Sequence, residues 1–287
     1  MLYSLHKIID QSNCPFSEKD YSLFKFGNIS CAKKFANELF TGFIEEHFDL
    51  ILAQNEIIVL SSPYYSIPTA SNYLCHFFKE NLNRFLFKNG RGACKESKIH
   101  RNQTYLDDYG NMDFNQRISL IANDTYYIDR HYIDGKFCIF LDDIKITGSH
   151  EFTINKILDH YHVKGEFLFV YYAELINKDI HPNIENHYNY FAIQSLHDIT
   201  NIINGDSFQF NTRLVKYLLQ LNDMDFNTLV NNISSEKTNE LMSLAVSNNY
   251  HLIDLLKNNI IKLEQLWQST YKRDKERVLD LQSSQLA

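Results

Sequence analysis

Cysteine is scarce in this sequence, and it shows no pairing pattern. The 287 residues contain five widely spaced cysteines and no C-x-x-C motif, so neither a disulfide framework nor a zinc site is indicated. Positive charge is also in deficit, because 28 lysines and arginines stand against 35 aspartates and glutamates. The net charge of −7 leaves no basic footprint for nucleic acid or an anionic membrane, so any phosphate site must be built locally.

Long apolar runs and the common nucleotide motifs are absent as well. No run approaches the length of a membrane-spanning helix, and the N-terminus lacks the charged start and apolar core of a signal peptide. We therefore expect a soluble, cytoplasmic protein without membrane contact. The sequence has no G-x-G-x-x-G, no Walker lysine loop and no G-x-S-x-G elbow. His181, Glu185 and His187 lack the spacing of a zinc helix.

The most informative stretch is Phe137–Glu151. Its first five residues are all apolar, which predicts a strand buried on both faces of a parallel sheet. Asp142 and Asp143 follow at the predicted carboxyl end, where open α/β sheets bind ligands. Thr147–Ser149 then adds hydroxyls and leads into an amphipathic helix whose first amides attract anions. The stretch therefore offers what a ribose 5-phosphate needs, although an acidic turn that merely caps the next helix is the plainer alternative.

This stretch resembles the phosphoribosyl-diphosphate (PRPP) loop of the type I phosphoribosyltransferases: an apolar strand, two acidic residues, a few variable residues and a Thr-Gly turn. The resemblance implies that Asp142 and Asp143 hold the ribose hydroxyls, serve catalysis and ligate Mg²⁺. It implies that the phosphate is bound by the loop that follows, Ile144, Lys145, Ile146, Thr147, Gly148, Ser149 and His150. Ile146 and His150 replace hydroxyl residues of the family pattern. The form of the whole motif resembles the branch found in bacterial stress and tellurium-resistance gene clusters.

A second combination of strand, loop and helix precedes this one. Ile57–Leu60 predicts a short strand, and residues 69–81 predict a helix. In the resembled family the intervening loop binds pyrophosphate, which implies substrate contacts for Ser62, Pro63, Tyr64 and Tyr65. This loop has no glycine, where the family often has them. Its prolines alone would explain a turn and a helix start, so both interpretations stay open.

Basic residues that precede the central motif are few. Arg101 stands at the end of the next predicted strand, Lys98–Arg101, and the resemblance implies a catalytic role at the pyrophosphate, where a planar guanidinium pairs well with phosphate oxygens. Residues 102–116 match the position of the family's closing loop, but they are acidic where a lysine is often found. Lys25, between two phenylalanines, resembles a hood segment over the base; a solvated lysine explains it equally well.

The order of apolar segments defines the expected architecture. Strands near residues 57, 98, 137 and 167, with helices between them, predict an α/β protein with a parallel, Rossmann-like sheet of the type I phosphoribosyltransferase kind. Beyond it, helical spacing without good strands predicts a helical extension. We therefore divide the chain into an N-terminal helical or hood segment (1–50), an α/β core (51–178) and a helical extension or small helical domain (179–287).

The function that the resemblance implies is a Mg²⁺-dependent enzyme of nucleotide metabolism or stress response. It would be a phosphoribosyltransferase, a pentosyl transferase that moves the phosphoribosyl group of PRPP to a nitrogenous base and releases pyrophosphate. Family habit implies a homodimer with a small-molecule substrate. One alternative is a non-catalytic sensor or assembly module that binds a ribose phosphate or nucleotide, and another is an enzyme acting on a different ribosyl phosphate. An enzyme needs both phosphate sites, whereas a sensor needs only one.

Overall fold

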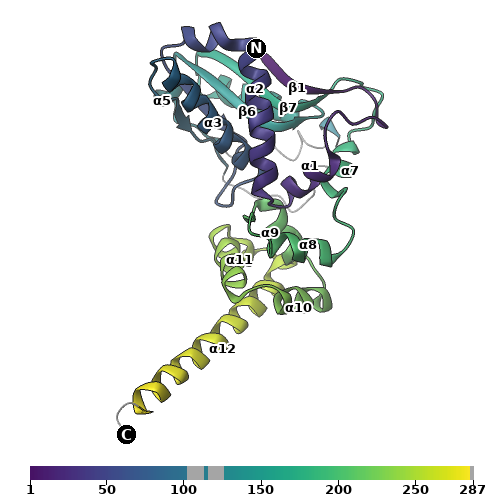
Figure 1. Ribbon diagram of the computed structural model, residues 1–287, viewed down its shortest axis with the longest axis vertical. Coiled ribbons are helices and arrows are strands. Elements are labelled where there is room, and N and C mark those ends of the chain that lie inside the picture. The colour runs from purple at the N-terminus through teal and green to yellow at the C-terminus, as the bar shows by residue number, and fades with distance from the viewer. Residues whose placement is uncertain (102–112, 116–125, 285–287) are drawn as a thin grey trace. The chain divides into compact units, whose positions relative to one another are not determined.

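The computed structural model describes residues 1–101, 113–115 and 126–284, with the backbone alone from residue 270 onward. Five parallel strands form one sheet in the order β1-β7-β6-β2-β3 (Figure 1). Their bounds are Leu2–Ile8 (β1), Ile57–Ser61 (β2), Lys95–Ser97 (β3), Lys136–Lys145 (β6) and Gly165–Leu175 (β7). The predicted parallel α/β sheet is confirmed.

Strand β6 lies at the centre of the sheet. It pairs with β2 on one side and with β7 on the other, and Phe137 to Leu141 are all buried as the apolar run predicts. The strand continues to Lys145, so Asp142 and Asp143 belong to the strand itself rather than to a turn after it. Because successive side chains of a strand alternate, the two carboxylates point to opposite faces of the sheet.

Helices cover both faces of this sheet. On one face, helices α2 (Ile29–Ala53) and α3 (Ala70–Lys88) pack on a core that includes Val59, Ile139, Leu141, Leu168 and Val170. On the other face, α5 (Arg130–Ile133) and α6 (Ser149–His160) pack on a core that includes Ile58, Leu60, Cys138, Phe140 and Phe169. The alternation of these strand residues between two cores is what a doubly covered parallel sheet requires.

Two parts of the sheet differ in detail from the sequence predictions. The N-terminal segment, predicted to be helical, begins with the edge strand β1 at Leu2–Ile8, beside β7. The strand predicted near residue 98 is present as β3 but ends at Ser97, and His100–Arg101 (β4) pairs antiparallel with Tyr126–Tyr127 (β5). Both short strands form through pairing with segments distant in sequence, which local apolar patterns do not encode.

Glu174 ties the edge strand β1 to the sheet. Its Oε2 accepts a hydrogen bond of 2.9 Å from Ser4 Oγ and lies 3.0 Å from Lys7 Nζ, and its Oε1 lies 3.3 Å from Lys145 Nζ. Burial by itself would raise the pKa of Glu174, but these three partners outweigh burial and lower it. A carboxyl whose folded pKa is lowered stabilises the fold above its unfolded pKa, and that contribution is lost as the pH falls through the folded value.

We therefore expect Glu174→Gln to lower the free energy of unfolding by about 1 kcal/mol near neutral pH, because the charged acceptor is lost. Urea unfolding at about pH 7 and about pH 3 would measure this, with the difference from wild type shrinking at the acidic pH. Glu166→Gln on the same strand, at an exposed position, is the matched control and should change neither value. An equally large loss at both pH values would contradict the prediction.

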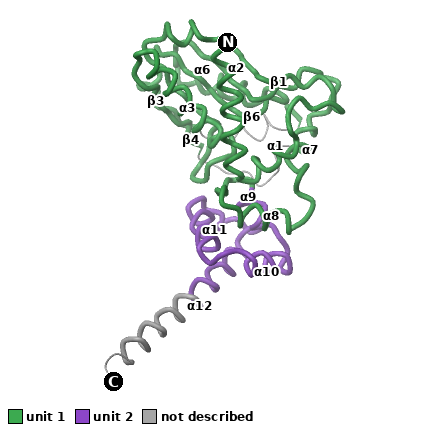
Figure 2. The backbone as a smooth tube through the Cα atoms, viewed as in Figure 1, with its two compact units in different colours: residues 1–213 green, residues 214–287 purple. Residues whose placement is uncertain are grey.

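Two compact units divide the chain after Arg213, and the predicted boundary near residue 178 lies within the first of them (Figure 2). Unit 1 also contains α1 (Glu18–Lys25), α7 (Ile184–Tyr190) and α8 (Leu196–Ile203). The predicted helical C-terminal region is present as α9 (Thr212–Leu219), α10 (Asp223–Asn232), α11 (Ser235–Ser247), the short 3₁₀ helix η2 (Tyr250–Leu252) and α12 (Asp254–Ser284). Within the described parts of the chain, no helix combines the length and apolarity that crossing a membrane requires.

Candidate functional site

A pocket of about 70 Å³ opens at the carboxyl end of β6. It is lined by residues 142–150, by Tyr171 of β7 and by Glu185 of α7. The turn from β6 into α6 contains Gly148, whose φ of +77° lies in the left-handed region that glycine adopts without strain. Gly148 precedes the first turn of α6, where backbone amides lack partners within the helix and attract anions. The predicted strand, turn and helix therefore meet at one pocket.

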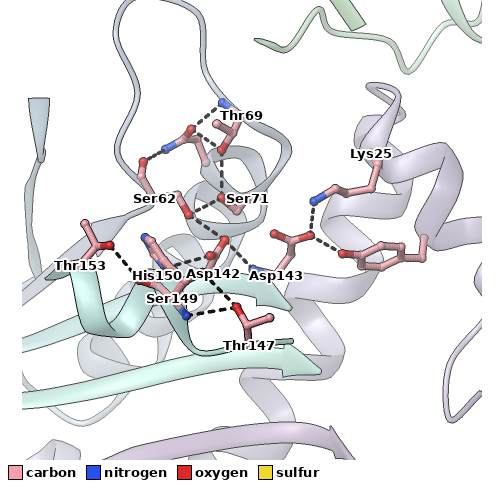
Figure 3. A network of polar contacts seen from close by, with 12 residues as sticks. Lys25, Ser62, Thr69, Ser71, Asp142, Asp143, Thr147, Ser149, His150 and Thr153 are labelled. Atoms are coloured by element: carbon pink, nitrogen blue, oxygen red, sulfur yellow. Dashed lines mark hydrogen bonds and ion pairs between the residues drawn. The ribbon is translucent and has the colours of Figure 1, made fainter. Parts of the chain in front are cut away.

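Asp142 is held on the α6 side of the sheet (Figure 3). Its Oδ1 accepts hydrogen bonds from Ser62 Oγ at 2.7 Å and from the Asp143 amide at 2.9 Å, and its Oδ2 lies 2.9 Å from His150 Nδ1. Burial by itself would raise the pKa of Asp142, but His150 and the hydrogen bonds hold it well below its usual range. Burial would lower the pKa of His150, and Asp142 reverses this and raises it. The two groups form a partly buried ion pair between β6 and the start of α6.

Asp143 points to the opposite face, toward α1. Its Oδ2 accepts from Tyr21 Oη and from Lys25 Nζ, both at 2.5 Å (Figure 3). The side chains of Lys25 and Asp143 are only 11% and 7% exposed. Burial raises the pKa of Asp143, and the neighbouring Asp142 adds to this, while Lys25 acts in the opposite direction without cancelling it. The net effect is a raised pKa of Asp143. The buried ion pair is therefore not by itself evidence of added stability.

The predicted pyrophosphate loop contacts Asp142 through Ser62. Ser62 Oγ, which donates to Asp142, accepts a hydrogen bond of 2.8 Å from Ser71 Oγ in the first turn of α3. The start of α3 is satisfied by its own side chains, since the Thr69 amide donates to Asn72 Oδ1 at 2.6 Å and Asn72 Nδ2 donates to the Ser62 carbonyl at 3.2 Å. The start of α3 is thus capped by its own side chains and tied to the loop before it.

The rest of that loop lies beside Arg101. Tyr64 forms a bridge with His100, and the Arg101 amide donates to the Tyr64 carbonyl at 3.4 Å. Lys98 Nζ lies 3.5 Å from the centre of the Tyr64 ring and donates to the Tyr65 carbonyl at 3.0 Å. Arg101 is also close enough to His150 to act against the protonation of that ring. Arg101 therefore lies near both the loop after β2 and His150.

The remaining predicted residues fall into two groups. Pro63 is buried, while Ile144, Lys145, Ile146 and Thr147 line the pocket with the rest of the 142–150 loop. Residues 102–116, expected to form a closing loop, lie outside the described residues except for 113–115.

Sequence reasoning missed three residues at the site. Tyr21 and Tyr171 come from segments that carry no motif, and Glu185 was weighed only as a zinc ligand. Glu185 of α7 and Tyr171 of β7 line the pocket, and Tyr21 of α1 donates to Asp143. Lys25 was singled out for a hood, and the pattern of a lysine between aromatics is the signal that could have found its contact with Asp143. The face-alternation of β6 could also have shown that Asp142 and Asp143 need separate partners.

A central parallel strand that carries two adjacent carboxylates and leads through a Thr-Gly turn into a helix defines a parallel α/β protein, a class whose ligand sites lie at the carboxyl ends of the strands. The family relationship is more specific. This chain belongs to the family described as PRTase ComF-like, whose model matches residues 1–263. The resemblance to the phosphoribosyltransferases stated from the motif is therefore confirmed at the level of the family.

Among solved structures, the chain is similar to an adenine phosphoribosyltransferase from Saccharomyces cerevisiae at 13% identity and a TM-score of 0.29, over 49% of this chain and 68% of that one. It is similar to a hypoxanthine phosphoribosyltransferase from Staphylococcus aureus at 10% identity and a TM-score of 0.30, over 53% and 76%. No curated protein matches the sequence.

Proposed function

We propose that this chain is a phosphoribosyltransferase that binds PRPP at the β6–α6 pocket and transfers the phosphoribosyl group to a nitrogenous acceptor. The observation that carries the proposal is the union, in one pocket, of Asp142, Asp143 and the amides and hydroxyls of Thr147–Ser149. In this reaction a nitrogen attacks C1 of the ribose while the C1–O bond to pyrophosphate breaks. The work of the protein is to position both partners and to neutralise the leaving charge.

Each group of the pocket has a part in the proposed chemistry. Asp142 and Asp143 accept from the ribose hydroxyls, and the start of α6 with Thr147 and Ser149 donates to the 5-phosphate. Arg101 lies at the second loop, where the pyrophosphate would leave. We propose a homodimer as the working assembly, in keeping with the family.

The carboxylates of the pocket fit a Mg²⁺ ion that arrives with the ligand. Oxygen ligands are those that Mg²⁺ takes, and it is commonly held by one or two carboxylates together with substrate phosphates. Asp143 Oδ1 receives no hydrogen bond from the described residues, so this oxygen remains for such an ion. Those residues contain no cluster of three or more His, Cys, Asp or Glu side chains for a metal, and phosphate oxygens of the ligand would supply the further oxygen ligands. When bound, Mg²⁺ would neutralise charge on the pyrophosphate.

A non-catalytic sensor of ribose phosphates or nucleotides is the second candidate. The self-capped start of α3 and the glycine-free loop before it favour this function, because they weaken the second phosphate site. The pairing of both carboxylates with cations of the chain also suits a site that binds without turnover. A reaction on another ribosyl phosphate would use the same pocket.

Calorimetric titration separates these functions. We expect PRPP with Mg²⁺ to bind at least about 10-fold more tightly than ribose 5-phosphate, because only PRPP reaches the second loop. Arg101→Gln should weaken PRPP and leave ribose 5-phosphate unchanged, and pyrophosphate should be released when a base is added. Equal affinities for the two ligands, without release of pyrophosphate, would favour the sensor. Absence of binding by either ligand would remove both functions.

A further inference from the structure

Tyr171 is a buried residue of β7 whose hydroxyl has no partner among the described residues. It is the register partner of Asp142 in β6, and its side chain is 1% exposed among the apolar residues that face α6. The hydroxyl makes no hydrogen bond with the described residues. Leaving a buried hydroxyl unpaired costs stability, and such groups are uncommon in folded proteins. An acceptor from outside the chain would explain this position.

The position of Tyr171 in the pocket indicates that such an acceptor would belong to a bound ligand. Tyr171 lines the same pocket as the Thr147–His150 turn and the start of α6. Burial raises the pKa of its hydroxyl well above the usual value, and the nearby carboxylates of Asp142, Glu151 and Glu174 add to this effect. The group is therefore a neutral O–H donor at physiological pH, and it belongs to a residue that lines the pocket.

The charges around Tyr171 are compatible with an anionic ligand. The three carboxylates each have a cationic partner: Asp142 pairs with His150 at 2.9 Å, Glu151 with Lys145 at 2.7 Å, and Glu174 with Lys7 at 3.0 Å. These three carboxylates are thus each balanced by a cation, while Glu185 also lines the pocket. The amides at the start of α6 and the Tyr171 hydroxyl supply hydrogen-bond donors to it.

We propose that the Tyr171 hydroxyl is a further ligand-binding group, which donates a hydrogen bond to a phosphate oxygen of the sugar phosphate held by the β6–α6 turn. This inference rests on the proposed function, since it assigns a donor to the ligand of the same pocket. It adds a donor from β7 to the donors that come from the turn and the start of α6. Tyr171 thereby makes binding depend on a ligand that carries an oxygen acceptor at this position.

Tyr172 provides a matched control from the next position in the strand. It is also 1% exposed, but it faces the other side of the sheet and donates to Glu38 Oε2 at 2.7 Å. The two tyrosines therefore differ in what their hydroxyls do. Removing the hydroxyl of Tyr172 takes away an internal hydrogen bond, whereas removing that of Tyr171 breaks no hydrogen bond with the described residues.

The experiment compares Tyr171→Phe and Tyr172→Phe in the full chain by urea unfolding and by titration with ribose 5-phosphate and inorganic phosphate. We expect Tyr171→Phe to raise the urea midpoint and to weaken both ligands by roughly 10- to 100-fold, because a hydrogen bond to a charged group is lost. We expect Tyr172→Phe to lower the urea midpoint and to leave both affinities unchanged.

Other outcomes identify which statement fails. If the wild type binds ribose 5-phosphate and Tyr171→Phe binds it equally well, the role of Tyr171 is overturned and the proposed function stands. A lowered urea midpoint for Tyr171→Phe would show that the hydroxyl has an acceptor within the protein, which also overturns it. If the wild type binds neither ribose 5-phosphate nor PRPP, the proposed function fails and the inference fails with it.

Discussion

Replacing Asp143 with asparagine should lower the free energy of unfolding by about 3 kcal/mol, because it leaves the ammonium of Lys25 buried without a negative partner. The asparagine carbonyl can still accept from Tyr21, so the loss isolates the charge of the pair from the hydrogen bond. The Lys25 side chain is 11% exposed, so water screens it little. Urea unfolding at neutral pH would measure the change.

The double variant Lys25→Met with Asp143→Asn should regain most of that loss. A buried ion pair that is replaced on both sides is often neutral for stability, since the cost of desolvating both charges also disappears. The exposed pair between Lys34 and Asp20 offers a matched control, and Lys34→Met should change stability by less than about 1 kcal/mol. A double variant as unstable as Asp143→Asn alone would show that the pair itself holds α1 on the sheet.

Asp142→Asn should weaken the binding of ribose 5-phosphate by roughly 100-fold, because hydrogen bonds from the ribose to a charged acceptor are replaced by bonds to a neutral amide. The asparagine carbonyl can still accept from Ser62, so the loop before α3 should keep its place. The lost charge also leaves His150 without the anion that raises its pKa, which reduces the positive charge at the start of α6. Calorimetry with ribose 5-phosphate and PRPP would measure the loss.

Asp159→Asn is the control for this change. Asp159 is an exposed residue of α6, outside the pocket, and its replacement alters the net charge by the same amount. Its affinity for ribose 5-phosphate should equal that of the wild type. An Asp142→Asn variant that also binds as tightly as the wild type would remove the carboxylate from the ligand site.

The local part of the site could be predicted because it is continuous in sequence. The buried strand, the acidic pair and the Thr-Gly turn occupy adjacent positions of the chain, and each has its own pattern of apolarity, charge or glycine. The end of β6 could not be placed from these patterns. Residues 142–145 are polar or mixed, yet pairing with β7 extends the strand to Lys145 and sends the two carboxylates to opposite faces.

The partners of the carboxylates could not be predicted for a different reason. Tyr21 lies 122 residues from Asp143 in sequence, and Ser62 lies 80 residues from Asp142. Such contacts depend on how α1 and the loop after β2 pack against the sheet, and no local preference encodes that packing. The pKa of Asp143 and that of Asp142 consequently move in opposite directions, although the two residues are neighbours of the same type.

The sequence by itself determined the class of the fold, the central strand and the loop that defines the family, because these follow from apolar runs and from residues close together in the chain. Tertiary structure alone decided which cation faces each carboxylate, where the edge strand β1 pairs, and that Tyr171 lines the pocket with a hydroxyl that has no partner among the described residues. Burial and charge act through space, and distance along the chain does not reveal which groups they join.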